Sequence, residues 1–268
     1  MSNMLYTTFA GRLLLKILTS PAVSKMAGSF MNSSLSKFII EPFIKKNSID
    51  MSDYKIENWK CFNDFFTRNL RPGKRYIDMN ELSLISPCDG YLTVYNISDD
   101  SSFNIKNTSY TLSELLQNNI LASEYEGGLC LVFRLTPSDY HRYIYPDTGA
   151  KLKNVSIPGI FHTVRPIAFE KYPVFKTNCR EYCVLGTNNF DDVVFMEVGA
   201  MMVGKIVNYH QEYNFTRGEE KGKFEFGGST IIMIIKKDIA LIDTDIKISS
   251  NHGKEFKVKL GQSIGVRI

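Results

Sequence analysis

The sequence lacks a large charge surplus, a nucleotide-binding loop and a long uncharged apolar run. Its 32 Lys and Arg residues against 28 Asp and Glu residues leave a formal net charge of only +4. No nucleic-acid-binding motif accompanies this charge, so nucleic acid is not an expected partner. Neither GxxxxGK[ST] nor GxGxxG stands between a strand and a helix, which argues against nucleotide binding. No run reaches the roughly 18 apolar residues of a membrane span, and no secretory signal is recognisable.

Cysteine and histidine are both scarce. The five cysteines are odd in number and include no CxxC pair, which favours a reducing compartment over a disulfide framework. Cys179 and Cys183 are the closest two, but no His or Cys pair follows at zinc spacing, so no metal site is predicted. Acid–base chemistry by imidazole is limited to four residues, namely His141, His162, His210 and His252.

The first fifty residues differ in texture from the rest of the chain. Their apolar residues recur at helical spacing, which predicts helices. Basic residues interrupt the pattern: Arg12, Lys16, Lys25, Lys37, Lys45 and Lys46. Helices of this composition can lie in a membrane interface. They can equally form a helical hairpin packed on its own domain, and both interpretations stay open on composition alone.

From about residue 84 the sequence is typical of a β-rich domain. Short strand-like runs are separated by turn signals, and one stretch, YTLSELLQNN at 110–119, predicts a helix. The runs are YLTVYNI, LCLVFRL, YCVLGT, VVFMEVGAMMVGKIV, STIIMIIKK and FKVKLGQSIGV. We therefore expect an α+β fold that is mainly β, with N-terminal helices followed by a sandwich- or barrel-like domain.

Two histidines lie in contexts that suit a general base. His141 follows a strand-like run in SDYHRYIYPD, with Asp139 and Arg142 beside it, and such neighbours can orient an imidazole. His162 lies in the turn-like stretch GIFHTVRP. Both also fit surface loops without a chemical role. Asp89, in SPCDGYL, is by itself best explained as turn chemistry, because Asp-Gly commonly forms a turn.

The stretch GKFEFGGST at residues 222–230 is unusual for a strand. Gly227 and Gly228 cost backbone entropy and contribute nothing to packing, yet they stand directly before Ser229 and an apolar run. Either the strand bulges here, or bare backbone is needed beside a hydroxyl that reacts.

Several motifs, taken together and in order, resemble those of the phosphatidylserine decarboxylases. The resemblance runs from about residue 58 to the C-terminus, and the N-terminal helices fit it loosely. Each motif is weak alone, whereas the set in register is specific. They read CFNDFFTRNLRPGKRYI, SPCDG, DYHRY, HTVRPIAFEKYPVFKTNCREYCVL, VGAMMVGKI, RGEEKGKFEFGGST and GKEFKVKLGQSIG.

The resemblance implies a proenzyme that cuts its own Gly228–Ser229 bond, giving chains of residues 1–228 and 229–268. Ser229 would become a pyruvoyl group at the new N-terminus, with no need for pyridoxal phosphate or a metal. Gly228 then makes sense, because it leaves the approach of the serine hydroxyl to its carbonyl unhindered. The pyruvoyl group would act as the electron sink for converting phosphatidylserine to phosphatidylethanolamine and CO2.

By the same resemblance, Asp89 would be the carboxylate of the self-cleavage relay and His141 an active-site histidine. Asp139 would be a second candidate carboxylate. The sequence departs from the family at Ile144, where the family carries the histidine assigned as the base for self-cleavage. Isoleucine cannot accept a proton. Either His141 or His162 takes over that role, or the chain does not process.

A phospholipid substrate favours the interfacial interpretation of the N-terminal helices. We expect a peripheral membrane protein at the cytoplasmic face, with a membrane-associating region at 1–50 and a catalytic domain at 51–268. Whether two copies form a homodimer is left open. Two other functions are considered: a non-processing homologue that binds lipid surfaces, and a pyruvoyl decarboxylase of a soluble amino acid.

Overall fold

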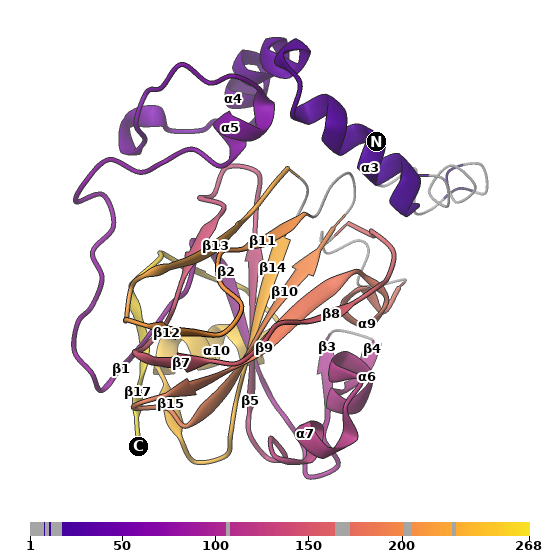
Figure 1. Ribbon diagram of the computed structural model, residues 1–268. Coiled ribbons are helices and arrows are strands. Elements are labelled where there is room, and N and C mark those ends of the chain that lie inside the picture. The colour runs from indigo at the N-terminus through magenta and orange to yellow at the C-terminus, as the bar shows by residue number, and fades with distance from the viewer. Residues whose placement is uncertain are drawn as a thin grey trace.

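The computed structural model describes Thr8, Gly11 and residues 18–105, 108–163, 172–200, 205–226 and 229–268. The predicted cleavage site therefore lies partly outside these residues, because Gly228 is not among them while Ser229 is. The chain folds around one large sheet, with helices of the N-terminal region over one end of it (Figure 1).

The central sheet has nine strands and is open. Its path runs through β12 (Tyr213–Phe215), β7 (Gly149–Lys151), β9 (Arg180–Thr187), β10 (Asp192–Gly199), β14 (Ser229–Ile235), β5 (Leu129–Leu135), β2 (Gly90–Asn96) and β16 (Phe256–Val258), and β8 (Val155–Ile157) pairs with β9. All these pairings are antiparallel. In β14 every one of the seven residues is buried, as expected of an apolar run covered on both faces.

Two layers cover the central sheet. On one face lie two three-stranded sheets and a helix: β11 (Ile206–Asn208) with β13 (Glu220–Phe224) and β6 (Arg142–Ile144), β1 (Ser83–Ile85) with β17 (Ser263–Arg267) and β15 (Ala240–Ile242), and α10 (Thr244–Asn251). On the other lie the hairpin of β3 (Ser102–Ile105) and β4 (Thr108–Thr111), with α6 (Leu112–Leu116), α7 (Asn119–Ser123) and α9 (Val174–Thr177).

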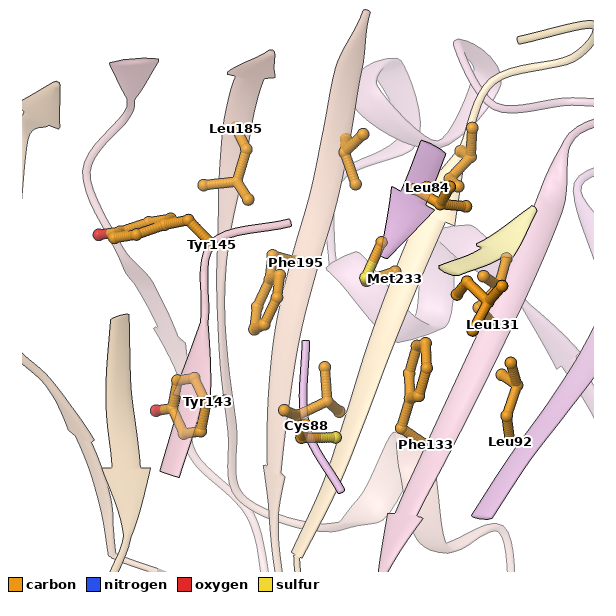
Figure 2. Close-up of a cluster of buried hydrophobic side chains, with 14 of the residues drawn as sticks. Leu84, Cys88, Leu92, Leu131, Phe133, Tyr143, Tyr145, Leu185, Phe195 and Met233 are labelled. Carbon is orange, nitrogen blue, oxygen red and sulfur yellow. The ribbon is translucent and has the colours of Figure 1, made fainter. Parts of the chain in front are cut away.

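Alternating side chains of the central strands supply both cores. Along β14, Ile231 and Met233 belong to the core beneath the two small sheets, whereas Ile232 and Ile234 belong to the core beneath the helices. This is the two-residue period of a strand buried on both faces. Figure 2 shows the first of these cores, where Met233 packs among side chains from neighbouring strands.

The N-terminal region forms short helices that pack on a third, aromatic core. They are α3 (Pro21–Met31), η1 (Ser34–Ile39), α4 (Ile40–Asn47), η2 (Met51–Asp53) and α5 (Phe62–Phe66). Ser20 caps α3 by accepting a hydrogen bond from the Val23 N–H at 3.4 Å, with proline in the first turn. Beneath them the third core includes Tyr140, Ile144 and Leu260 of the β-rich domain. None of the described helices is long and apolar enough to cross a membrane.

The mainly β prediction is confirmed, but the described strands do not close into a barrel, because β12 and β16 leave the central sheet open. The single helix predicted at 110–119 is two helices. Thr111 and Glu114 form a capping box at the start of α6, and Gln117 then adopts a left-handed conformation that ends it. Helix α10 was missed by the sequence pattern, because Ile246 is buried while Ile248 on the same short helix is half exposed.

Candidate active site

Ser229 opens strand β14, and its side chain is fully buried. It pairs with Gly199 on β10 and with Leu135 on β5. Because side chains alternate along the strand, it faces the same core as Ile231. Its Oγ has no hydrogen-bond partner among the described residues. A buried hydroxyl without a partner costs free energy, so Ser229 is a candidate for a reacting group. The described residues hold four other such hydroxyls, on Ser24, Tyr110, Tyr143 and Thr230.

The loop after β5 carries Asp139 and His141, and it starts at Leu135, a pairing partner of Ser229. The Asp139 carboxylate accepts hydrogen bonds from the Thr136 N–H at 2.7 Å and from the Thr136 hydroxyl at 2.6 Å. These bonds close the loop on itself. The carboxylate of Asp139 therefore shapes the loop that presents His141.

His141 is buried beside the strand that leads to Ser229. Its carbonyl accepts a hydrogen bond from the Phe224 N–H at 2.9 Å, near the end of β13. Its Nδ1 lies 2.9 Å from the Asp139 carbonyl oxygen, which can only accept, so Nδ1 carries the proton and Nε2 keeps a lone pair. Burial, with the nearby Arg68 guanidinium, lowers the pKa of His141 to about 3. The imidazole is therefore neutral at pH 7.

Asp89 is buried and fully engaged. Arg75 donates two parallel hydrogen bonds to its carboxylate, from Nε to Oδ1 at 2.8 Å and from Nη2 to Oδ2 at 2.5 Å. The Leu260 N–H also donates to Oδ1, at 2.9 Å. Asp89 is thus a paired buried anion and does more than form a turn. Arg75 was not singled out from the sequence, although it lies within the motif CFNDFFTRNLRPGKRYI.

Ile144 lies on β6 next to the loop that carries Asp89. Its N–H donates to the Pro87 carbonyl at 2.9 Å, and its side chain belongs to the third core together with Leu260. The position is therefore adjacent to Asp89, but its side chain contributes only apolar packing. No proton can be relayed from this position.

His162 is linked to the end of β10 through Asn178. Its ring stacks on Tyr172 with centroids 4.4 Å apart. The Asn178 amide links it to the site: it accepts from the His162 N–H at 3.0 Å and donates to the Gly199 carbonyl at 2.8 Å. Gly199 is the cross-strand partner of Ser229. Each candidate histidine is thus linked by hydrogen bonds to a residue near the start of β14, His141 to Phe224 and His162 through Asn178 to Gly199.

The segment just before the predicted cleavage bond is tied to helix α5. The Phe226 N–H donates to the Asn63 carboxamide oxygen at 2.9 Å, and the Phe226 ring packs edge-on against Phe66, 5.2 Å between centroids. Phe66 in turn lies 4.0 Å from the His141 ring. Phe226, two residues before Gly228, is therefore connected to His141 through a single intervening side chain, the ring of Phe66.

A buried ion pair lies between the sheets close to this site. Lys221 on β13 donates to Glu197 on β10 and, at 2.6 Å, to the Asn208 side chain. Both charged side chains are completely buried. Glu197 is two residues from Gly199, and Lys221 is on the strand that leads to Ser229. The pair thus ties β10, which pairs with β14 at the serine, to β13, the strand that precedes β14 in the sequence.

The residues at the site are compatible with a pyruvoyl group. Such a group is built from the serine itself, and the buried, unpartnered Oγ of Ser229 meets that requirement. Within the described ranges, no cluster of three or more His, Cys, Asp or Glu residues is arranged to hold a metal ion.

Comparison with known proteins gives a consistent assignment. A family model described as phosphatidylserine decarboxylase matches residues 62–266. A phosphatidylserine decarboxylase proenzyme 2 of Clostridium acetobutylicum is 47% identical over 262 residues, which cover 97% of this chain and 90% of that protein. The phosphatidylserine decarboxylase proenzyme of Ruminiclostridium cellulolyticum is 44% identical, covering 98% and 90%. That of Clostridium perfringens is 43% identical, covering 90% and 84%.

These matches confirm the resemblance that the ordered motifs predicted, and they extend it through most of the N-terminal region. The chain therefore belongs to the phosphatidylserine decarboxylase family, a family of carboxy-lyases.

Proposed function

We propose that this chain is a self-processing phosphatidylserine decarboxylase. It cuts its Gly228–Ser229 bond, converts Ser229 to a pyruvoyl group, and releases CO2 from phosphatidylserine to leave phosphatidylethanolamine. The observation that carries the proposal is the fully buried, unpartnered Ser229 hydroxyl at the start of β14, next to the loop of His141.

Self-cleavage needs a base, because a serine hydroxyl is a poor nucleophile until its proton is removed. The activated Oγ of Ser229 attacks the Gly228 carbonyl carbon. The C–O bond forms as the C–N bond breaks, and the proton passes to the nitrogen, which gives an ester. Elimination then releases the carboxylate of residues 1–228, and hydrolysis of the remaining dehydroalanine yields ammonia and the pyruvoyl group.

We assign the base role to His141. Its neutral imidazole keeps the Nε2 lone pair free of the Asp139 contact. Ser229 faces the core that contains Phe224, and the Phe224 N–H binds the His141 carbonyl. His162 stacks on Tyr172, which packs on the opposite core. Asp89, held by Arg75, contributes negative charge on the His141 side.

The pyruvoyl carbonyl, once formed, supplies the electron sink that takes up the pair left when CO2 departs. The chain's own residues contribute the environment. Burial at the start of β14 keeps bulk solvent away from that position, and a histidine that took the Ser229 proton during cleavage can deliver one to the product carbon.

Replacing His141 by alanine is expected to slow self-cleavage by about 10²–10⁴-fold, the usual effect of losing a general base. His162→Ala should process at nearly the wild-type rate. A time course of intact mass during cell-free synthesis measures both. The sharpest control adds Ile144→His to His141→Ala, because this restores an imidazole beside Asp89 and should recover cleavage. Loss of cleavage in His162→Ala alone would instead assign the base to His162.

We also propose that the N-terminal region carries the enzyme to the membrane, as a peripheral protein on the cytoplasmic face. Four apolar side chains of α3 and η1 are strongly exposed: Met26 (74%), Phe30 (40%), Leu35 (72%) and Phe38 (73%). Four exposed lysines accompany them, namely Lys25, Lys37, Lys45 and Lys46. We call these eight residues the N-terminal patch. Apolar insertion plus attraction to anionic lipid is the physics of interfacial helices.

The position of the patch suits a lipid substrate. Figure 1 shows α3, α4 and α5 over one end of the strands, and α5 contacts Phe226 just before the start of β14. A headgroup at the surface that binds these helices would therefore be near Ser229. A division between an N-terminal region at 1–50 and a catalytic domain at 51–268 remains part of this proposal.

The double change Leu35→Ser with Phe38→Ser should weaken binding to vesicles containing phosphatidylserine by roughly 100-fold or more, since each inserted apolar side chain contributes about 1.5 kcal/mol or more. Vesicle sedimentation measures the loss. The matched control is Ile120→Ser with Leu152→Ser, at sites 80% and 60% exposed elsewhere on the surface. If both double changes weaken vesicle binding equally, the N-terminal patch is not the membrane-binding surface.

One observation favours a second function. Ile144 interrupts the family's relay, so a homologue that binds phosphatidylserine surfaces without processing is the alternative. It predicts an intact chain that sediments with vesicles and releases no CO2.

A further inference from the structure

Arg68 is a buried arginine whose guanidinium is poorly satisfied. It is only 1% exposed. Its three hydrogen bonds are long: Nη1 donates to the Phe66 carbonyl at 3.4 Å, and Nη2 donates to the Ser138 and Asp139 carbonyls at 3.2 and 3.4 Å. Among the described residues its Nε has no hydrogen-bond partner and no carboxylate forms an ion pair with it.

The other buried arginines show what a structural guanidinium looks like in this fold. Arg217 pairs with the buried carboxylate of Asp147. Arg180 has no acidic partner, but all three of its nitrogens donate to backbone carbonyls at short distances, reaching Leu115 (2.8 Å), Glu114 (2.9 Å), Lys176 (3.0 Å) and Asn178 (3.1 Å). Arg68 has neither the anion nor the full set of short bonds.

Arg68 lies directly beside His141. The Asp139 carbonyl oxygen accepts from both side chains, from Arg68 Nη2 at 3.4 Å and from His141 Nδ1 at 2.9 Å. The guanidinium also lies over two aromatic rings, 4.0 Å from the Tyr54 centroid and 5.1 Å from the Phe65 centroid. A buried, unpaired cation is costly, and an oxyanion bound next to it removes that cost.

We infer that Arg68 binds the phosphodiester of the substrate headgroup, an inference that rests on the proposed function. Its planar fork matches the oxygen spacing of a phosphate, and its uncommitted Nε–H supplies a donor for it. Arg68 and Ser229 are both buried, so a headgroup reaches either of them only when the surrounding chain moves.

The headgroup carries two anions, a phosphodiester and a carboxylate. The chemistry of decarboxylation favours the phosphodiester as the group that Arg68 binds. The carboxylate loses its charge as CO2 departs. A cation that held it would stabilise the ground state more than the transition state and slow the reaction. The phosphodiester keeps its charge throughout, so binding it orients the lipid without opposing the chemistry.

Occupation of Arg68 would also prepare His141. After burial, the Arg68 charge is the main cause of the lowered pKa of His141. An anion at Arg68 offsets that charge and raises the proton affinity of the neighbouring imidazole. Headgroup binding would thus make His141 a better proton carrier when a substrate is present.

Direct binding to the purified protein tests the inference by calorimetry, independently of turnover. One probe, dihexanoyl phosphatidylmethanol, has a phosphodiester but neither amine nor carboxylate. The other, N-acetyl-O-hexanoylserine, has a carboxylate but no phosphate. Arg68→Gln should weaken the phosphodiester probe by about 10- to 100-fold, the range for a charged hydrogen bond, and change the carboxylate probe little. Arg68→Lys should fall between, and Arg180→Gln should bind like wild type.

Several results would overturn the assignment. The assignment fails if the wild-type protein binds only the carboxylate probe or binds neither probe, and this result requires no variant. It also fails if Arg68→Gln loses affinity for the carboxylate probe, or if Arg180→Gln loses as much affinity for the phosphodiester probe as Arg68→Gln does. If Arg68→Gln does not fold, the binding of the two probes by the wild-type protein still decides against the assignment when only the carboxylate probe binds. Failure of the wild type to release CO2 from phosphatidylserine overturns the proposed function instead, and leaves the binding result interpretable.

Discussion

Ser229→Ala is expected to yield one intact chain of 268 residues and no CO2 release, whereas the wild type separates into residues 1–228 and 229–268. Alanine has no oxygen to attack the Gly228 carbonyl and cannot become a pyruvoyl group, so both activities are lost together. Intact mass measures the first, and release of labelled CO2 from phosphatidylserine vesicles measures the second. The shorter wild-type chain should also resist Edman degradation, because its N-terminus is a keto group.

Strand β14 offers a matched control for this change. Thr230 is also fully buried, and its hydroxyl also lacks a partner within the described part of the chain, but it faces the opposite core. Thr230→Val removes that hydroxyl at constant shape and should leave cleavage and turnover intact. A folded wild-type protein that stays uncleaved would contradict the proposal of self-processing and favour the lipid-binding alternative.

The second large effect concerns the buried pair of Glu197 and Lys221. Lys221→Met is expected to lower the free energy of unfolding by about 3–5 kcal/mol, because it leaves the Glu197 carboxylate buried without its cation. Urea denaturation measures the change. It is best done in the Ser229→Ala background, where the chain stays whole and unfolding involves a single chain.

Two further variants define that result. Adding Glu197→Gln to Lys221→Met removes both charges and should recover most of the loss, since a neutral pair costs far less to bury. Lys176→Met breaks the exposed ion pair with Glu114 and should change the free energy of unfolding by less than about 1 kcal/mol. Equal losses from Lys221→Met and Lys176→Met would contradict the special role given to the buried pair.

Strands with continuous apolar or alternating runs were the predictable part of the fold. The predicted run LCLVFRL coincides with β5, and the predicted run STIIMIIKK contains β14 and two further residues. Continuous apolar runs of this kind can be recognised without knowledge of distant residues. Sheet order was not predictable, since the pairing of β14 with both β5 and β10 joins segments far apart in sequence. For the same reason the open sheet could not be distinguished from a barrel.

The site was predictable as a set of motifs but not as a set of partners. Asp89 was interpreted as a turn residue because its partner Arg75 is 14 positions away in the sequence, and the two meet only in the folded chain. Arg68 showed nothing unusual, because lack of a partner is a property of the folded environment. Ile144 was recognised as a departure from the family, and the structure adds that it lies against the Pro87 carbonyl beside Asp89.

The position of the predicted cut has a consequence for how the mature protein denatures. The segment 229–268 supplies β14 and β16 to the central sheet and β15 and β17 to a smaller one, so it is threaded through two sheets. Once cut, the fragments stay together only by non-covalent packing. After complete unfolding they must find each other in a bimolecular step that the uncut precursor never faced. Recovery from denaturation should therefore depend on dilution for the mature enzyme and not for its precursor.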